Sequence, residues 1–328
     1  MATLLLSGTA VANDLTTIAL ICPEQAADFG WNQQGVDGAQ AAAKAHGLKF
    51  VAAAGVGYGD VRPELRQLVE DGVGLVFIHG PYVENAIDVA FETKTPMAVT
   101  SENIMKPPYI TGYTLGGQEG AYLAGQLAAK TTKTGVLGIV VSSESPTWNA
   151  QSAGFMMGAR SITPSITIHY AVIGPQAYSD VAGARRVTEA MLATGADVIL
   201  GQGDGATFGM LQAIDTYKPA NGGNVWFIDV IGDKTSLDKG HLLSSIVWNF
   251  EPVFSQIIDD LKNGSFATHG YQLRLQDNSI GLLHTKHIPD DVWASVMKTR
   301  DDIIAGNIKV EKVFDAAKVK AMVSASVQ

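Results

Sequence analysis

The chain has little of several features that define common protein classes. Only one of its 328 residues is a cysteine, Cys22, so an internal disulfide is excluded. No apolar run approaches the roughly 20 residues that a membrane-spanning helix needs. Lysine and arginine number 23 against 32 acidic residues, and the net charge is -9. Because nucleic acids bind basic surfaces, we expect no nucleic acid partner and no polybasic membrane contact.

Motifs of the common nucleotide-binding and catalytic sites are also missing from the sequence. It contains no G-x-G-x-x-G, no G-x-x-x-x-G-K-[ST], no G-x-S-x-G and no H-E-x-x-H pattern. We therefore expect a protein that is not an enzyme and that uses no cofactor and no metal.

What is present is a globular composition with an alternating pattern of strands and helices. Apolar runs such as residues 136–141 are typical of parallel strands that are buried on both faces. Amphipathic segments such as 60–70 lie between these runs, at the spacing of βα units. The pattern restarts near residue 135, which indicates an α/β protein of two similar lobes. The expected strands are 17–22, 49–53, 74–79, 97–100, 109–112, 136–141, 167–172, 197–200, 225–231, 242–247, 271–275 and 280–283.

The first residues resemble the end of a secretory signal. A short apolar stretch precedes Ala10-Val11-Ala12, an A-x-A pattern that is typical of a cleavage site. We expect residues 1–12 to be a signal peptide remnant and the mature protein to be periplasmic. No cysteine lies near Ala12, so we do not expect a lipid anchor.

The most informative segment follows the first expected strand. Asp28, Trp31 and Asn32 stand between that strand and a helix-like segment at 38–45, at the carboxyl end of the strand. Small ligands bind at this place in open α/β folds. A carboxylate, a flat ring and a carboxamide suit a planar, nitrogen-rich ligand. The alternative is an ordinary βα loop in which Asp or Asn caps the helix.

Three of the five tryptophans support the ligand interpretation. Trp31, Trp148 and Trp248 fall at or just after expected strand ends, and an asparagine follows each of them. Rings at such positions can enclose a planar ligand, whereas the alternative is that they pack in the core or between the lobes. The glycine-rich turn 201–205 carries Asp204 at another strand end, and we expect it to contact the ligand as well.

These features, in this order, resemble the basic membrane protein family of ABC-importer solute-binding proteins, which includes the purine nucleoside receptors. The family opens with a strand and the motif Asp-x-Ser-Phe-Asn, which stands here as Asp28-Phe29-Gly30-Trp31-Asn32. The likeness continues at 75–80, 112–113, 119–125, 195–199 and 248–249, and it covers about residues 15 to 325.

The resemblance implies a type I periplasmic binding fold with two Rossmann-like lobes, three crossings and a ligand in the cleft. The implied lobes are 15–112 with 250–281, and 113–249 with 282–328. Hinge closure near Tyr113, Asn249 and Gly281 would produce the form that a membrane permease recognises. We expect a monomer. The expected ligand-binding residues are Asp28, Phe29, Trp31, Asn32, His79, Glu102, Trp148, Asn149, Gly203, Asp204, Asp233, Trp248 and Asn249.

Two departures from the family concern the ribose. Nucleoside receptors place a lysine in an S-x-x-K-N pattern, where this chain has Trp248, and they carry a G-x-D-x-D pattern of which only Asp233 aligns. A free purine base, or another flat polar solute, is therefore an alternative to a nucleoside.

Three other functions remain as alternatives. The first is a receptor of the same fold for a sugar or another small polar solute. The second is a repressor of this fold, which would need about sixty residues of helix-turn-helix ahead of the first strand. The third is a nucleoside-processing α/β enzyme, which would need a carboxylate cluster or a base with a partner.

Overall fold

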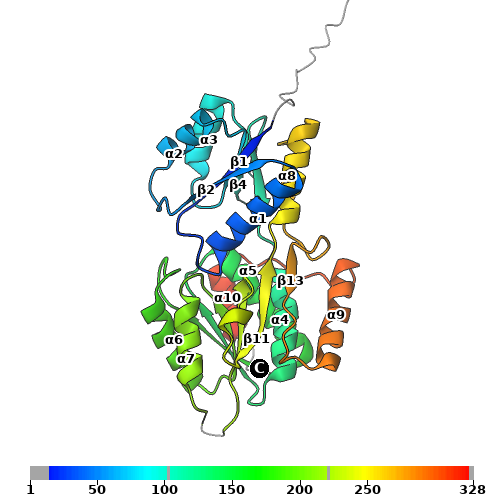
Figure 1. Cartoon of the computed structure of the whole chain (residues 1–328). Helices are drawn as coiled ribbons and strands as arrows, with labels where there is room; N and C mark the ends of the chain where they lie inside the picture. Colours follow the sequence, from blue (N-terminus) through cyan, green and yellow to red (C-terminus); the bar gives the residue numbers. More distant parts are fainter. Residues whose placement is uncertain (1–14, 102–103, 220–221, 325–328) are drawn as a thin grey trace, which may run out of the picture. The chain divides into compact units, whose positions relative to one another are not determined.

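A computed structural model of the chain describes residues 15–101, 104–219 and 222–324 (Figure 1). They divide into two compact units. Unit 1 comprises the residues up to Gln25, Gly35–Thr114 and Phe250–Gln272, and unit 2 comprises Ala26–Gln34, Leu115–Asn249 and the residues from Leu273 on. The lobe boundaries that the resemblance implies place 26–34 and 273–281 in the first lobe instead, and they stay a prediction.

The described strands of unit 1 form a seven-stranded sheet in the order β12-β6-β4-β3-β1-β2, with β5 paired to β6. Only the β5–β6 pair is antiparallel among them. The strands are β1 (Thr17–Cys22), β2 (Lys49–Ala54), β3 (Leu75–Ile78), β4 (Met97–Thr100), β5 (Met105–Lys106), β6 (Ile110–Thr114) and β12 (Tyr271–Gln272). The helices are α1 (Trp31–Ala45), whose first residues belong to unit 2, α2 (Arg62–Glu70), α3 (Val83–Thr93) and α8 (Glu251–Asn263).

Helices cover both faces of the unit 1 sheet because its central strands are apolar on both sides. All four residues of β3 are buried. Ile78 faces the cluster that contains Leu65 of α2 and Val89 of α3, whereas Phe77 stacks on Phe254 of α8 at 4.2 Å between ring centroids. The sole cysteine, Cys22, is buried at the end of β1.

The described strands of unit 2 form a six-stranded sheet in the order β13-β11-β10-β9-β7-β8, in which only the β11–β13 pair is antiparallel. Its strands are β7 (Val136–Val141), β8 (Thr167–Val172), β9 (Val198–Gln202), β10 (Trp226–Ile231), β11 (Leu242–Trp248) and β13 (Ile280–Leu282). Its helices are α4 (Gln118–Thr131), α5 (Pro146–Ile162), α6 (Val181–Ala193), α7 (Thr207–Thr216), a 3₁₀ turn η1 (Thr235–Leu237), α9 (Asp290–Ile304) and α10 (Ala316–Ser324).

Helices α4 and α5 pack closely through glycines. A Cβ atom at Gly158 of α5 would lie 1.9 Å from the carbonyl oxygen of Tyr122 in α4, and one at Gly125 of α4 would lie 2.0 Å from the carbonyl oxygen of Phe155. Only glycine permits this approach. On the other face of the sheet, α6 and α7 cover residues such as Ile199 and Phe227.

The prediction of an α/β protein with two parallel sheets flanked by helices is confirmed. Two local expectations were wrong, and three elements were missed. The helix expected at 38–45 begins at Trp31, the strand expected at 271–275 pairs only at Tyr271–Gln272, and the pattern gave no sign of α3, α10 or β5. None of the helices within the described ranges has the length and apolar character that crossing a membrane requires.

Candidate functional site

The segment 26–34 is ordered by the carboxylate of Asp28. Oδ1 accepts hydrogen bonds from the backbone N–H groups of Gly30 (2.9 Å) and Gln33 (3.1 Å). Oδ2 accepts from the backbone N–H of Asn32 (3.0 Å) and from its Nδ2 (2.8 Å). A carboxylate offers about four lone-pair sites, and these donors use all four. Asp28 therefore stabilises the first turn of α1, which is the helix-capping role given above as the alternative to ligand binding.

The same bonds place Trp31 and Asn32 in the first turn of α1 and not in a free loop. Trp31 is partly exposed, whereas Asn32 is buried. The backbone N–H of Trp31 donates to Oδ1 of Asp204 at 3.3 Å, and Asp204 follows β9. This bond joins two segments of unit 2 that lie 173 residues apart in the sequence.

Three tryptophans meet in unit 2. The ring of Trp248, the last residue of β11, lies 6.2 Å from the ring of Trp31 at an interplanar angle of 87°, and 6.1 Å from the ring of Trp148 at 37°. Trp148 is fixed from two sides, because its indole N–H donates to Oγ of Ser142 (3.1 Å) and its backbone N–H donates to Oγ of Ser145 (3.3 Å). Trp148 and Trp248 are buried at 5% and 2% exposure, so Trp31 is the most accessible ring of this tryptophan cluster.

Asp204 is the acidic group beside the tryptophan cluster. It is 7% exposed, and a Cβ atom at Gly30 would lie 3.1 Å from its Oδ1. Burial raises the pKa of the neighbouring Tyr178 hydroxyl; a hydrogen bond with Ser143 lowers this pKa, and the negative charge of Asp204 raises it further. Asp204, Tyr178 and Ser143 thus form a polar group at the carboxyl ends of β7 and β9.

Phe29 makes further contacts between this segment and the rest of unit 2. Its ring packs edge-on against Phe208 of α7 at 6.3 Å between centroids. Its carbonyl oxygen approaches Gly232, at the end of β10, so closely that a Cβ atom there would lie 2.1 Å away. Phe29 itself has a φ of 52°, in the left-handed region that few non-glycine residues adopt.

The structure therefore brings together four of the expected site residues, which are Trp31, Trp148, Asp204 and Trp248. Phe29, Asp28 and Asn32 join them through the turn that they form. All seven belong to unit 2, and they lie at the carboxyl ends of its strands.

Four expected residues of unit 2 lie around this group with other contacts. Asn149 is buried, and its Nδ2 donates to the carbonyl of Phe314 at 2.8 Å. Gly203 is buried, and its carbonyl accepts from Oγ1 of Thr207 at 3.0 Å. Asp233 and Asn249 are exposed, after β10 and β11 respectively.

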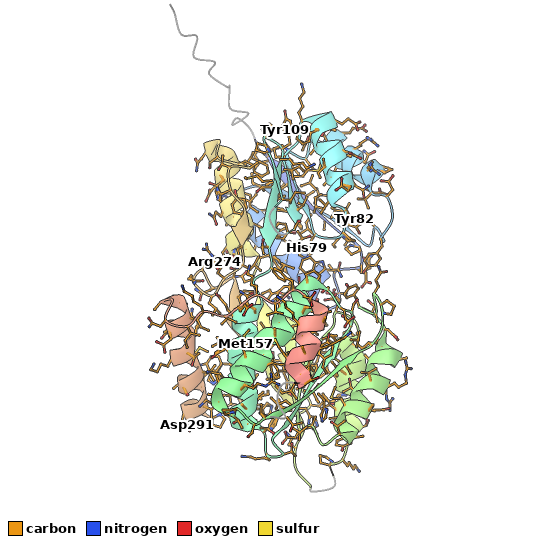
Figure 2. The ribbon with its side chains drawn as sticks, turned by 180° about the vertical axis from the view of Figure 1, so that it is seen from behind. His79, Tyr82, Tyr109, Met157, Arg274 and Asp291 are labelled. Carbon is orange, nitrogen blue, oxygen red and sulfur yellow. The ribbon has the colours of Figure 1, made fainter. Side chains whose placement is uncertain are left out.

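The other two expected residues do not belong to this group. His79, labelled in Figure 2, lies in the core of unit 1 with no exposed surface. Its Nδ1 is 3.0 Å from the hydroxyl of Tyr113, its ring lies 4.9 Å from that of Phe250, and a Cβ atom at Gly35 would lie 2.5 Å from it. These contacts make His79 a packed core residue of unit 1. Glu102 lies outside the described residues.

The sequence interpretation missed a buried ion pair next to the group. Asp229 in β10 has no exposed surface and Lys234 is 1% exposed, and their carboxylate and ammonium groups are 3.2 Å apart. Burial raises the pKa of Asp229, and the charge of Lys234 opposes this rise. The signal in the sequence is an aspartate inside the apolar strand Trp226–Ile231.

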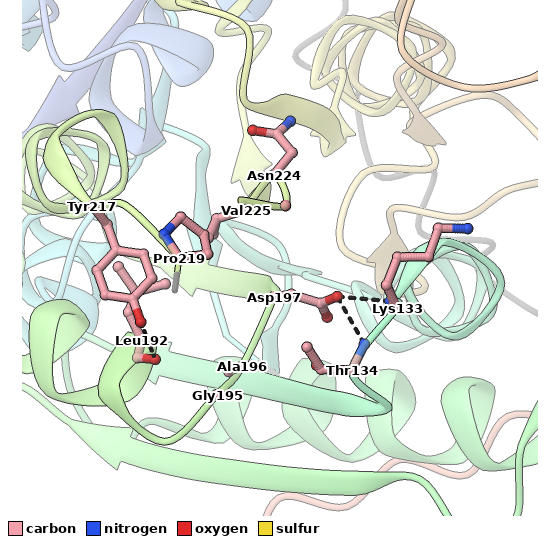
Figure 3. A pocket seen from close by; sticks show the side chains of 11 residues that line it. Lys133, Thr134, Leu192, Gly195, Ala196, Asp197, Tyr217, Pro219, Asn224 and Val225 are labelled. Carbon is pink, nitrogen blue, oxygen red and sulfur yellow. Dashed lines mark hydrogen bonds between the residues drawn. The ribbon is translucent and has the colours of Figure 1, made fainter. Parts of the chain in front are cut away.

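A separate cavity of about 270 Å³ lies at the other end of the strands of unit 2 (Figure 3). Asp197, just before β9, lines this cavity. Its carboxylate accepts hydrogen bonds from the backbone N–H groups of Lys133 (2.7 Å) and Thr134 (3.0 Å). The hydroxyl of Tyr217 donates to the carbonyl of Leu192 at 3.1 Å. These polar groups form hydrogen bonds within the protein, so we assign no ligand to this cavity. In the described ranges, no three His, Cys, Asp or Glu side chains lie together as metal ligands would.

Comparisons with known proteins agree with this architecture. The model of the Bmp family, described as "ABC transporter substrate-binding protein PnrA-like", matches residues 15–313. The chain is 28% identical over 332 residues to the ABC transporter nucleoside-binding protein BmpA of Lactococcus lactis, covering 93% of this chain and 92% of the relative.

Solved structures with the same fold include two ABC transporter solute-binding proteins. The protein from Conexibacter woesei has a TM-score of 0.75 at 20% identity, over 92% of this chain and all of that one. The protein from Aeropyrum pernix has a TM-score of 0.77 at 18% identity, over 95% and 99% of the two chains. Proteins of this kind bind a small molecule outside the cytoplasm and deliver it to a membrane permease. With the family model matching nearly its whole length, the chain belongs to the Bmp family of ABC transporter substrate-binding proteins.

Proposed function

We propose that the protein is a receptor for a purine base or nucleoside, and that the ligand binds at the tryptophan cluster of unit 2. The observation that carries the proposal is the meeting of Trp31, Trp148 and Trp248 beside the carboxylate of Asp204. A purine offers flat faces to aromatic rings and N–H donors to a carboxylate. The name of the Lactococcus relative, a nucleoside-binding protein, supports the same ligand class.

The site residues divide into those that face the ligand and those that support them. Trp31 is the partly exposed ring on which a base can stack, and such stacking contributes about 1–3 kcal/mol per base. Trp248 and Trp148 back it from the interior. Asp204 accepts a hydrogen bond from an N–H of the base, and the exposed Asn249 and Asp233 contribute polar groups at the neighbouring strand ends.

Five further expected residues of unit 2 support these groups. Asp28 and Asn32 hold the turn that presents Trp31. Gly203 directly follows β9 and allows the tight turn to Asp204, since a Cβ atom there would lie 3.0 Å from that of Ala206. Asn149 fixes α5 to the residues before α10 through Phe314. Phe29 anchors the segment on α7.

We also propose that the mature protein works as a periplasmic monomer and that it releases its ligand unchanged. The A-x-A pattern at Ala10–Ala12, which is typical of a secretory cleavage site, supports this location.

Calorimetric titration tests the ligand proposal. The protein is unfolded, freed of copurified ligand and refolded, and it is then titrated with adenine, guanine, hypoxanthine, adenosine, guanosine and uridine, with ribose as a control. We expect at least one purine compound to bind with a Kd below about 1 µM. Chromatography of the mixture afterwards should return the ligand unchanged.

The pattern across the panel decides the ligand class. A preference for bases over their nucleosides agrees with Trp248 at the place where the family's nucleoside receptors have a lysine. Heat only with ribose would move the assignment to sugars. No heat with any of the seven compounds, from a protein that has refolded, refutes a purine receptor.

A further inference from the structure

The buried ion pair of unit 2 connects the two segments against which residues 26–34 lie. Nζ of Lys234 is 3.2 Å from Oδ2 of Asp229 and donates a hydrogen bond to the carbonyl of Val230 at 2.8 Å. Oδ1 of Asp229 accepts from Oγ1 of Thr207 at 3.2 Å. Thr207 begins α7, directly after the turn that carries Asp204. The pair therefore ties the segment 203–207 to the turn 231–234.

The turn 231–234 has an unusual backbone that the lysine helps to hold. Ile231 has a φ of 73°, which is disfavoured for a β-branched residue. The hydrogen bond from Lys234 to Val230 closes the chain around Ile231, and Oγ of Ser245 donates to the carbonyl of Gly232 at 2.7 Å. Such a conformation persists only where its surroundings impose it, and it is found at ligand-binding sites more often than elsewhere.

Both segments contact residues 26–34. Asp204 accepts the backbone N–H of Trp31 at 3.3 Å. Gly232 packs so closely against the carbonyl oxygen of Phe29 that there is no room for a Cβ atom. The position of Trp31 therefore depends on both segments at once, and the Asp229–Lys234 pair ties these segments together.

A contribution to stability alone does not explain a buried charge pair. Removing two charges from water is costly, and apolar residues of similar volume often stabilise a protein equally well or better. Lys234 also does not supply a cation to the ligand, because it is 1% exposed and its ammonium group faces Asp229 and Val230.

We propose that Asp229 and Lys234 are positioning residues of the binding site, which hold the segments 203–207 and 231–234 in the arrangement that keeps Trp31 in place. The part of this proposal that concerns the ligand rests on the proposed function. The part that concerns the order of residues 26–34 does not.

Hydrogen–deuterium exchange of the full chain tests the structural part without any ligand. The variants are Lys234→Met and the double variant Asp229→Asn with Lys234→Met, which leaves no unpaired buried charge and so remains testable if the single variant does not fold. The matched control is Asp197→Asn, a carboxylate that is 8% exposed at the opposite end of β9 (Figure 3). We expect exchange in peptides covering 26–34 to be about tenfold faster in the pair variants, which corresponds to about 1.4 kcal/mol. In the control, exchange should rise near 132–136 only.

Titration with the tightest-binding purine of the calorimetric panel is the second readout. We expect the pair variants to bind it about tenfold more weakly and the control to bind it within about twofold of the unaltered protein. Unchanged exchange at 26–34 in a folded pair variant overturns the proposal. Faster exchange at 26–34 with an unchanged Kd overturns its ligand part. If no purine binds at all, the proposed function fails, and the exchange result alone still decides whether the pair orders the segment.

Discussion

Replacing Asp28 by alanine should destabilise the protein because one carboxylate accepts four hydrogen bonds. Three of the donors are backbone N–H groups, of Gly30, Asn32 and Gln33, and the carboxylate is 8% exposed. Loss of a helix-capping Asp ordinarily costs about 0.5–2 kcal/mol. Because several donors lose their acceptor together in a largely buried place, we expect a loss of about 2–3 kcal/mol for Asp28→Ala.

Urea unfolding followed by circular dichroism measures this loss. With an m value of about 2–3 kcal/mol/M, the midpoint should fall by about 1 M. The two units need not unfold together, so the transition that shifts is the one to be fitted. The control is Asp37→Ala, an exposed carboxylate in the same helix, which should change stability by no more than about 0.5 kcal/mol. Asp28→Asn keeps one acceptor oxygen and should lie between the two.

The same variants separate two roles of Asp28 in binding. If Asp28 acts by ordering the turn, the loss of ligand affinity should follow the loss of stability, with Asp28→Asn intermediate in both. An Asp28→Ala protein that is as stable as the unaltered one refutes the capping argument. Full stability combined with lost binding would show instead that the carboxylate contacts the ligand directly.

Three further predictions concern other parts of unit 2. Gly158→Ala should destabilise the protein by more than about 2 kcal/mol in urea unfolding, because its Cβ would lie 1.9 Å from the carbonyl oxygen of Tyr122. Burial raises the pKa of Asp238, but hydrogen bonds from backbone amides and His287 outweigh this effect and lower the pKa from 3.8 to about 2. Because the pKa is lower in the folded state, the ionised Asp238 stabilises the fold above pH 3.8 by an amount of order 1 kcal/mol after solvent screening. This contribution should disappear as the pH falls from about 4 to 2. In Asp238→Asn, the corresponding part of the decrease in unfolding free energy with falling pH should be absent. Trp31→Ala should weaken purine binding by about 5- to 150-fold in calorimetry, the equivalent of about 1–3 kcal/mol of stacking.

Each of these predictions has a control on the same unit. Gly174→Ala introduces a Cβ at an ordinary distance of 3.8 Å from that of Ala177 and should be tolerated. His287→Gln should reduce the acid slope only in part, because the backbone amides still donate to Asp238. Trp293→Ala removes a tryptophan outside the cluster, stacked on His284, and should leave purine affinity unchanged. Equal losses of affinity for Trp31→Ala and Trp293→Ala would contradict the assignment of the site.

Much of the fold could be predicted from the sequence because its strands carry strong local signals. All four residues of β3 and the last five residues of β7 are buried, and both read as continuous apolar runs. The early start of α1 could not be predicted, because it depends on the carboxylate of Asp28 reaching the N–H groups of Asn32 and Gln33. The pairs of β12 and β13 are short, and their register is set by β6 and β11, far away in the sequence.

The types of residue in the candidate site could be predicted from the sequence, but their contacts in space could not. Aromatic and acidic residues at strand ends pointed to Trp31, Trp248 and Asp204, but their contacts join parts of the chain about 200 residues apart, and no local pattern encodes them. His79 had the same strand-end signal and lies in the core, because Tyr113 and Phe250 enclose its ring. The inward course of Lys234 could not be read from the sequence either, since lysine is among the residues least often buried.

The tryptophan cluster also gives the molecule a built-in optical reporter. Trp248 lies about 6 Å from both Trp31 and Trp148, close enough for excitation energy to pass among the three indoles. The fluorescence of all three indoles will then depend on the most strongly quenched of them. A purine that stacks on Trp31 should change the fluorescence of three of the five tryptophans at once. Ligand occupancy could thus be followed in real time without any label.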